Sequence, residues 1–197
     1  MKKVIISIHG FNSGPGYKAQ ELQKQFPDCL VIAPQLPYDP RQAIELLTSL
    51  VDKYIDTEIH IVGTSLGGFY TMYLSTLYRE KYNIIYYAIN PSFEPHITLQ
   101  RYSKVVNYKS GESFQTSQEF YKVFEEYYNY IIDNYDSRCI HSSNYFIGTN
   151  DEVLNFDSFK EFIYSKKLPI RLDYSEQDHR FSNIAPVVSR LRGNMVL

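Results

Sequence analysis

The amino-acid sequence predicts an α/β fold in which a mostly parallel, six-stranded sheet is covered by helices on both faces. Two observations lead to this prediction. Short apolar runs of strand length recur along the 197 residues, and stretches with the helical spacing of apolar residues separate them. Strands that alternate with helices form parallel sheets, because each helix carries the chain back to the start of the next strand. At this length we expect a single domain, residues 1–197.

The strands and helices can be placed from these patterns. The expected strands are Val4–Ile8, Cys29–Ala33, Ile59–Val62, Ile84–Ile89, Tyr145–Gly148 and Ile170–Leu172. The expected helices are Tyr17–Phe26, Arg41–Tyr54, Leu66–Arg79, Thr116–Ile132, Asp157–Lys166 and Ser182–Arg192. With strands numbered in chain order, we expect the order 2-1-3-4-5-6 and a switch point between the first and third strands. Ligands bind at such a point, outside the carboxyl ends of the strands.

The composition limits the partners and the location of the protein. A net charge of −2, with both signs interspersed, gives no basic surface for nucleic acid. No stretch reaches the roughly 20 apolar residues of a membrane span. Cys29 and Cys139 lie in no paired metal or redox spacing, so we expect free thiols in a reducing compartment. These features predict a cytoplasmic protein without a metal or other cofactor.

The segment Gly63-Thr64-Ser65-Leu66-Gly67 follows one expected strand and precedes an expected helix. A G-x-S-x-G sequence in that context is typical of a nucleophile elbow, which presents the serine hydroxyl above the sheet. The flanking glycines supply small bulk where strand and helix meet. We therefore expect Ser65 to be a nucleophile. The alternative is a glycine-rich turn that matches the pattern by chance.

Two backbone N–H groups are expected to bind the oxyanion that forms during attack by Ser65. The N–H of Leu66 lies at the positive end of the following helix. The second donor is expected at the end of the first strand, where His9-Gly10 precedes Phe11 and the N–H of Phe11 turns into the site. The alternative is a flexible glycine loop. For His9 we favour a structural role, because such a role needs only a hydrogen bond.

His179 is the expected general base. In sheets of this kind the catalytic residues follow the chain order Ser, then Asp or Glu, then His. His60 lies inside a strand, His96 and His141 come before the expected acid, and His9 belongs to the oxyanion loop. His179 follows the last strand, where a loop can place the imidazole over the nucleophile. The alternative is a solvent-exposed loop histidine.

Asp151 is the expected acid that orients the base. It directly follows the strand Tyr145–Gly148 and would fix the tautomer of His179. Glu152 is the rival, with Asp157 behind it, and an acidic pair after a strand can also simply cap the next helix. We prefer Asp151 because it stands nearer the carboxyl edge of the sheet. Glu152 is then expected to meet solvent or to cap the following helix.

Six segments spread along nearly the whole chain carry distinctive motifs. They are His9-Gly10-Phe11-Asn12-Ser13, Pro34-Gln35-Leu36-Pro37, Gly63-Thr64-Ser65-Leu66-Gly67-Gly68-Phe69-Tyr70, Asn90-Pro91, Asn150-Asp151-Glu152-Val153-Leu154-Asn155 and Gln177-Asp178-His179-Arg180-Phe181. In these segments the chain resembles one family, the YqiA/YcfP-type small bacterial esterases of the α/β-hydrolase superfamily. The resemblance implies a compact α/β-hydrolase fold with Ser65 as nucleophile, Asp151 as acid and His179 as base.

A long connection, about residues 92–140, separates the fourth and fifth strands and could form a cap-like or lid-like insertion. An aromatic stripe lies in its helical part. We slightly favour ordinary packing of this helix on the sheet over a second interpretation, in which its other aromatics line an acyl pocket. This apolar stripe consists of the aromatic residues Phe120, Phe124, Tyr127 and Tyr128 together with Ile131.

Together these features predict a serine hydrolase, an esterase or thioesterase that cleaves small acyl esters or acyl thioesters through an acyl-enzyme on Ser65. The expected partner is the small-molecule substrate, without a cofactor, nucleic acid or membrane. The alternative is a catalytically idle protein with the same fold that binds a ligand or partner. An intact Ser65, Asp151 and His179 in the required order favour the enzyme.

Overall fold

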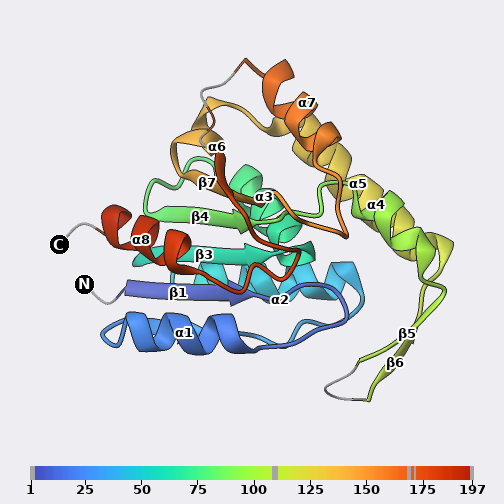
Figure 1. The fold of residues 1–197 in the computed structure, drawn as a ribbon, viewed down its shortest axis with the longest axis horizontal. Helices are drawn as coiled ribbons and strands as arrows, with labels where there is room; N and C mark the ends of the chain where they lie inside the picture. Colours follow the sequence, from blue (N-terminus) through green and yellow to red (C-terminus); the bar gives the residue numbers. More distant parts are fainter. Residues whose placement is uncertain (1–2, 108–110, 168–169, 171, 196–197) are drawn as a thin grey trace.

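A six-stranded, parallel sheet forms the centre of the protein (Figure 1). The computed structural model describes residues 3–107, 111–167, 170 and 172–195. The strand order is β2-β1-β3-β4-β7-β8, so the expected order and the switch point between β1 and β3 are confirmed. The strands are β1 (Lys3–Ile8), β2 (Leu30–Ile32), β3 (Glu58–Thr64), β4 (Ile84–Ile89), β7 (Ser143–Gly148) and β8 (Leu172–Ser175).

Helices cover both faces of this sheet, as the apolar patterns predict. One apolar cluster joins α1 (Tyr17–Gln25) and α8 (Ala185–Asn194) to one face of the sheet. The other face packs against α2, α3, α5 and α7 in a larger cluster. Their bounds are α2 (Pro40–Lys53), α3 (Leu66–Leu77), α5 (Gln118–Asn134) and α7 (Asp157–Ser165).

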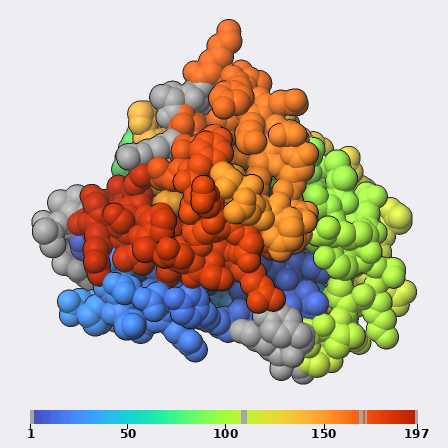
Figure 2. All heavy atoms as spheres, viewed as in Figure 1, coloured from blue at the N-terminus to red at the C-terminus, as the bar shows by residue number. Residues whose placement is uncertain are grey.

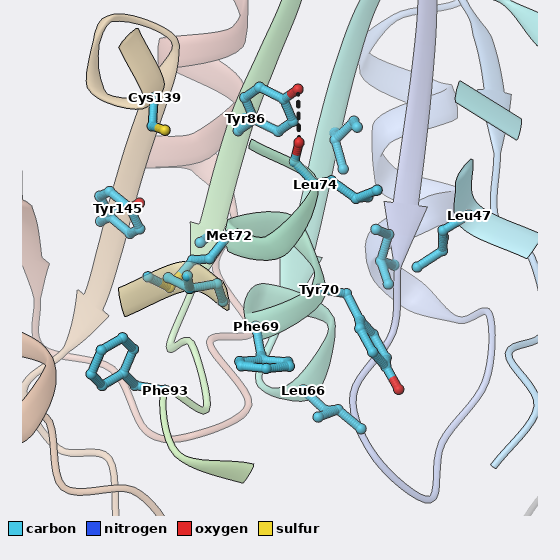
Figure 3. Close-up of a cluster of buried hydrophobic side chains, with 14 of the residues drawn as sticks. Leu47, Leu66, Phe69, Tyr70, Met72, Leu74, Tyr86, Phe93, Cys139 and Tyr145 are labelled. Atoms are coloured by element: carbon cyan, nitrogen blue, oxygen red, sulfur yellow. Dashed lines mark hydrogen bonds between the residues drawn. The ribbon is translucent and has the colours of Figure 1, made fainter. Parts of the chain in front are cut away.

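Helix α3 begins near the switch point and is deeply buried, with ten of its 12 residues buried. Figure 3 shows Phe69, Tyr70, Met72 and Leu74 on this helix among the buried side chains of the larger cluster. Each large apolar side chain buried in this way contributes about 1.5–3 kcal/mol. The helix is therefore anchored firmly, and so is the turn that leads into it.

Two expected boundaries near the C-terminus were wrong. The last strand is Leu172–Ser175, not Ile170–Leu172; Ile170 lies outside the strand, and Arg171 lies outside the described residues. This edge strand is only partly buried and has no continuous apolar run, which hid it from an apolar pattern. The last helix begins at Ala185 instead of Ser182; the Asn183 side chain accepts the N–H of Ala185 in a turn before the helix, and Pro186 lies in the first helical turn.

The connection between β4 and β7 contains elements that the sequence patterns missed. A hairpin of β5 and β6 projects from the body of the protein (Figure 1). Helix α5 packs on α3, with the Phe124 ring 5.9 Å from that of Phe69, so its aromatic stripe belongs to the core as we favoured. The added elements are α4 (Pro95–Thr98), the 3₁₀ helix η1 (Leu99–Arg101), β5 (Lys104–Val106), β6 (Ser113–Gln115) and α6 (Ser137–His141). Whether residues 92–140 act as a lid stays a prediction.

In the part of the chain that the structure describes, no helix is both long and apolar enough to cross a bilayer.

Candidate active site

Ser65 occupies a sharp turn between β3 and α3. Its backbone has φ 57° and ψ −118°, a conformation that non-glycine residues rarely adopt and that is typical of a nucleophile elbow. The turn requires its glycines. A Cβ on Gly63 would lie 2.1 Å from the carbonyl oxygen of Gly67, and a Cβ on Gly67 would lie 2.3 Å from that of Ile8. The strand, the turn and the helix therefore fit together only without these side chains.

Two hydrogen bonds connect Ser65 through His179 to Asp151. His179 Nδ1 lies 2.8 Å from Asp151 Oδ2, and His179 Nε2 lies 3.0 Å from Ser65 Oγ. An ionised carboxylate can only accept hydrogen bonds, so Nδ1 carries the proton and Nε2 is left to accept the hydroxyl proton. The structure thus brings together three residues that lie up to 114 positions apart in the sequence.

The Asp151 carboxylate is held in place by the backbone. Its side chain is 1% exposed, and Oδ1 accepts the N–H groups of Val153 and Leu154, each at 2.8 Å. Burial opposes ionisation, but the hydrogen bonds from His179 and from these two N–H groups outweigh it and lower the pKa of Asp151. Asp151 therefore stays ionised at neutral pH, with one oxygen left for the imidazole.

Neither of the two rival acids bonds to the imidazole ring of His179. The exposed Glu152 accepts the backbone N–H of His179 at 3.1 Å and does not bond to the ring. Glu152 meets solvent, as expected, and in addition accepts this backbone N–H, because the loop of His179 folds back within its reach. Asp157 begins α7, is 71% exposed and pairs with Lys160.

Asn90 holds the loop of His179 and was missed as a functional residue. It is fully buried at the end of β4, with φ 42°. Its Oδ1 accepts the N–H of Gly148 at 2.7 Å, while Nδ2 donates to the carbonyl oxygens of Asp178 (3.1 Å) and His179 (3.3 Å). One amide thus ties β4 to β7 and to the loop with the base. The signal in the sequence that could have identified Asn90 is an asparagine directly after a strand and before Pro91, because asparagine tolerates positive φ.

The expected oxyanion segment lies against Ser65. A Cβ on Gly10 would come within 3.2 Å of Ser65 Cβ, so the backbone that leads to Phe11 passes directly beside the hydroxyl-bearing residue. Leu66 is the first residue of α3, and its N–H has no partner within the helix. The roles of the Phe11 and Leu66 N–H groups stay predictions.

His9 makes the structural contacts that we favoured. Its Nε2 accepts the N–H of Leu36 at 3.0 Å, and Nδ1 lies 2.8 Å from the carbonyl oxygen of Gly10. The imidazole therefore joins the loop after β1 to the loop after β2. His60 is buried in β3, where its ring lies 2.8 Å from Glu58 and burial lowers its pKa.

A cavity of about 840 Å³ opens beside the hydroxyl of Ser65. Its walls come from the segment between β1 and α1, from the elbow and from the loop after β8. None of the residues that line it belongs to α5. In Figure 2 the C-terminal segment, in red, lies along the blue α1. The acyl pocket suggested for the aromatics of α5 is therefore not this cavity.

The family of the protein follows from a match that covers nearly all of the chain. Residues 4–193 match the model of a family described as an uncharacterised protein family, UPF0227. The chain belongs to the UPF0227 family. This match supports the resemblance to YqiA-type proteins that the sequence motifs indicate, while the description of the UPF0227 family names no activity.

Several solved structures share the fold of this UPF0227 member. Est1E from Butyrivibrio proteoclasticus is 15% identical, with 98% of this chain and 87% of Est1E covered and a TM-score of 0.70. The monoacylglycerol lipase of Paleococcus ferrophilus is 13% identical, with 96% and 94% covered and a TM-score of 0.67. FphF, a fluorophosphonate-binding serine hydrolase of Staphylococcus aureus, is 13% identical, with 96% and 82% covered and a TM-score of 0.69. At these identities the likeness establishes the α/β-hydrolase fold alone.

Proposed function

We propose that this protein is a serine hydrolase that cleaves small acyl esters or acyl thioesters through an acyl-enzyme on Ser65. One observation carries the proposal: hydrogen bonds run from Ser65 through His179 to Asp151 beside a cavity at the carboxyl edge of the sheet. The fold alone would not support it, because this fold hosts many functions. Est1E, which has the same fold, has also been solved with ferulic acid bound.

In the acylation step, His179 Nε2 accepts the proton of Ser65 Oγ while Oγ attacks the carbonyl carbon of the substrate. The Asp151 carboxylate stabilises the imidazolium that forms. The N–H groups of Phe11 and Leu66 donate to the oxygen on which negative charge develops. His179 then gives its proton to the leaving alcohol or thiol, and the acyl group stays on Ser65.

In the deacylation step, water takes the place of the leaving group. His179 Nε2 accepts a proton from this water as its oxygen attacks the acyl carbon, and the same two N–H groups bind the second oxyanion. Return of the proton to Ser65 Oγ releases the carboxylic acid. The ionised Asp151 is needed in both steps, because the imidazole becomes positively charged in each.

The alternative is an idle protein of the same fold that only binds a ligand or partner. The 3.0 Å contact of Ser65 Oγ with His179 Nε2 favours the enzyme, since binding alone does not require a base at the hydroxyl. The rare backbone conformation of Ser65 favours it too, because such conformations concentrate at functional sites.

A fluorophosphonate probe tests the proposal. We expect the wild type to be labelled once, on Ser65, and to hydrolyse a short-chain 4-nitrophenyl ester. Ser65→Ala is expected to lose labelling and several orders of magnitude of turnover. Ser189→Ala, which changes an exposed serine of α8, serves as the matched control and is expected to retain both. A wild type that neither reacts with the probe nor turns over any ester would support the idle protein instead.

A further inference from the structure

The cavity beside Ser65 carries charge of one sign. Its cationic lining residues are Lys18 and Arg180, and its other titratable lining residues are His9, Tyr17 and His179. Among the described residues that line it, none is an aspartate or a glutamate. The protein as a whole has a net charge of −2, so this local excess of positive charge runs against the overall composition. A cavity with cationic walls favours a ligand of negative charge.

Lys18 connects two walls of the cavity. It lies in the first turn of α1, and its Nζ donates to the carbonyl oxygen of Arg180 at 2.5 Å. An ammonium group has three N–H donors, and within the described part of the chain this is the one hydrogen bond of Nζ. Burial lowers the pKa of Lys18 to about 8, although the nearby Asp178 carboxylate opposes the effect. Lys18 thus remains charged at pH 7 while poorly solvated, and an anion beside it would compensate for the lost water.

Arg180 supplies the second cation. It directly follows His179 and is exposed at the cavity, and among the residues that the structure describes its guanidinium has no carboxylate partner. A guanidinium binds a carboxylate or phosphate through two parallel hydrogen bonds. Lys18 comes from α1 and Arg180 from the loop after β8, and the hydrogen bond between them holds both residues side by side at the cavity, where they can bind one group.

We propose that the substrate of this enzyme carries a carboxylate or phosphate group, which Lys18 and Arg180 bind while the ester carbonyl lies at Ser65. This inference rests on the proposed function and names its substrate class: anionic acyl esters or thioesters. A neutral ester offers Lys18 and Arg180 no anionic group to bind, so the same cavity selects against it.

Two esters of equal chain length test this selection. 4-Nitrophenyl monoadipate ends in a carboxylate where 4-nitrophenyl hexanoate ends in a methyl group. We expect kcat/KM of the wild type to be at least about tenfold higher for the monoadipate, the effect of one charge-assisted contact. Lys18→Gln and Arg180→Gln are each expected to lower this ratio about tenfold. Lys24→Gln changes an exposed lysine on the last turn of the same helix and is expected to keep the wild-type ratio.

Competition experiments determine whether the site prefers a carboxylate or a phosphate. Adipate and inorganic phosphate are compared as inhibitors of hexanoate hydrolysis, and the stronger inhibitor identifies the preferred anion. Equal kcat/KM values for the two esters in the wild type would contradict the inference. So would a ratio that neither Lys18→Gln nor Arg180→Gln lowers, because the cations would then not contact the charged end.

A binding measurement separates this inference from the proposed function. Ser65→Ala does not form the acyl-enzyme, so calorimetric titration of this variant with each ester measures binding alone. Suppose that the wild type cleaves no ester, that the monoadipate binds more tightly than the hexanoate, and that Arg180→Gln abolishes this difference. That result would support the anion site and contradict the hydrolase. Turnover of hexanoate without any preference for the monoadipate, in rate or in binding, would support the hydrolase and contradict the anion site.

Discussion

The two halves of the candidate site are built in different ways. The nucleophile half consists of the elbow, Gly63 to Gly67, and the end of β1, where backbone packs directly on backbone. The base half consists of the loops after β4, β7 and β8, where side chains hold the backbone through hydrogen bonds. In the first half a single Cβ would meet carbonyl oxygens at 2.1–2.3 Å. In the second half the contacts are hydrogen bonds of 2.7–3.3 Å from Asn90, Asp151 and Glu152.

Because the two halves are built differently, mutations in them are expected to affect stability and activity differently. A change in the nucleophile half disturbs packing, so it is expected to alter stability together with activity. A change in the base half exchanges one hydrogen-bonding group for another of similar size, so it is expected to alter activity with a smaller effect on the fold. Four pairs of measurements test this difference between the two halves.

The largest effect is expected for Asp151→Asn. Its Oδ1 would still accept the N–H groups of Val153 and Leu154, so the amide NH₂ would face His179 Nδ1. A donor there forces the proton onto Nε2, which then cannot accept the proton of Ser65. We expect turnover of one ester to fall by roughly three to four orders of magnitude.

Glu152→Gln is the matched control for that variant. A glutamine oxygen can still accept the backbone N–H of His179, so turnover is expected to change little. A severe loss in Glu152→Gln combined with a mild loss in Asp151→Asn would reverse the assignment of the acid.

The next effect concerns the elbow. Gly63→Ala places a Cβ against the backbone of Gly67 and the hydroxyl of Thr71, neither of which is the free end of a flexible side chain. We expect a loss of about 3 kcal/mol in the free energy of unfolding, measured in urea. Gly193→Ala serves as the control, because nothing lies within 4 Å of its Cβ; an alanine in α8 is expected to be neutral or to stabilise by up to about 1 kcal/mol. Equal stability of the two variants would refute the packing argument.

A smaller effect on activity is expected for Asn90→Asp. The carboxylate can still accept the N–H of Gly148, but it loses the donors to Asp178 and His179 and faces their carbonyl oxygens instead. We expect kcat to fall by roughly ten- to a hundredfold, because the loop that carries His179 loses two hydrogen bonds and the base shifts relative to Ser65.

Asn83→Asp supplies the comparison for Asn90. The amide of Asn83 also donates to two carbonyl oxygens, those of Ile55 and Thr57, but at the opposite end of the sheet. We expect this variant to lose stability while kcat stays near the wild-type value. If both variants lowered kcat equally, Asn90 would have no positioning role for His179.

The smallest expected effect is on stability in acid. Because the pKa of Asp151 is lower in the folded protein than its usual value of about 3.9, folding favours the carboxylate. The linked stability is present above the unfolded pKa and is lost as the pH falls through the folded pKa. Urea unfolding between about pH 5 and pH 2 should therefore show a steeper loss for the wild type than for Asp151→Asn. Parallel curves would show that the hydrogen bonds to Asp151 do not lower its pKa.

Much of the nucleophile half could be predicted from the sequence, because backbone packing leaves local signals. The glycines at 63 and 67 bracket Ser65 between an apolar strand and an amphipathic helix, and each feature is visible within about ten residues. The alternation of apolar runs and helices predicted the parallel sheet, and the expected strand order was that of a compact α/β-hydrolase sheet.

The base half was harder to predict, because its contacts join residues that are distant in sequence. Asp151 and His179 could be proposed from chain order alone, whereas the contact of Glu152 with the backbone of His179 depends on how the two loops fold. Asn90 acts on a loop 88 positions away, and no periodic pattern records such a contact. The bounds of the half-buried β8 were misplaced and the β5–β6 hairpin was missed for a related reason, since short strands at an edge need no continuous apolar run.

Trapping of the acyl-enzyme tests the central claim most directly. Wild-type protein is mixed with a 4-nitrophenyl ester, quenched in acid within the first turnover and digested, and the peptides are analysed by mass spectrometry. We expect one acyl group, on the peptide that contains Ser65, in step with a burst of nitrophenolate, and neither signal in Ser65→Ala. Steady hydrolysis by the wild type with no acyl group on Ser65, or an undiminished rate in Ser65→Ala, would contradict the assignment of Ser65 as the nucleophile.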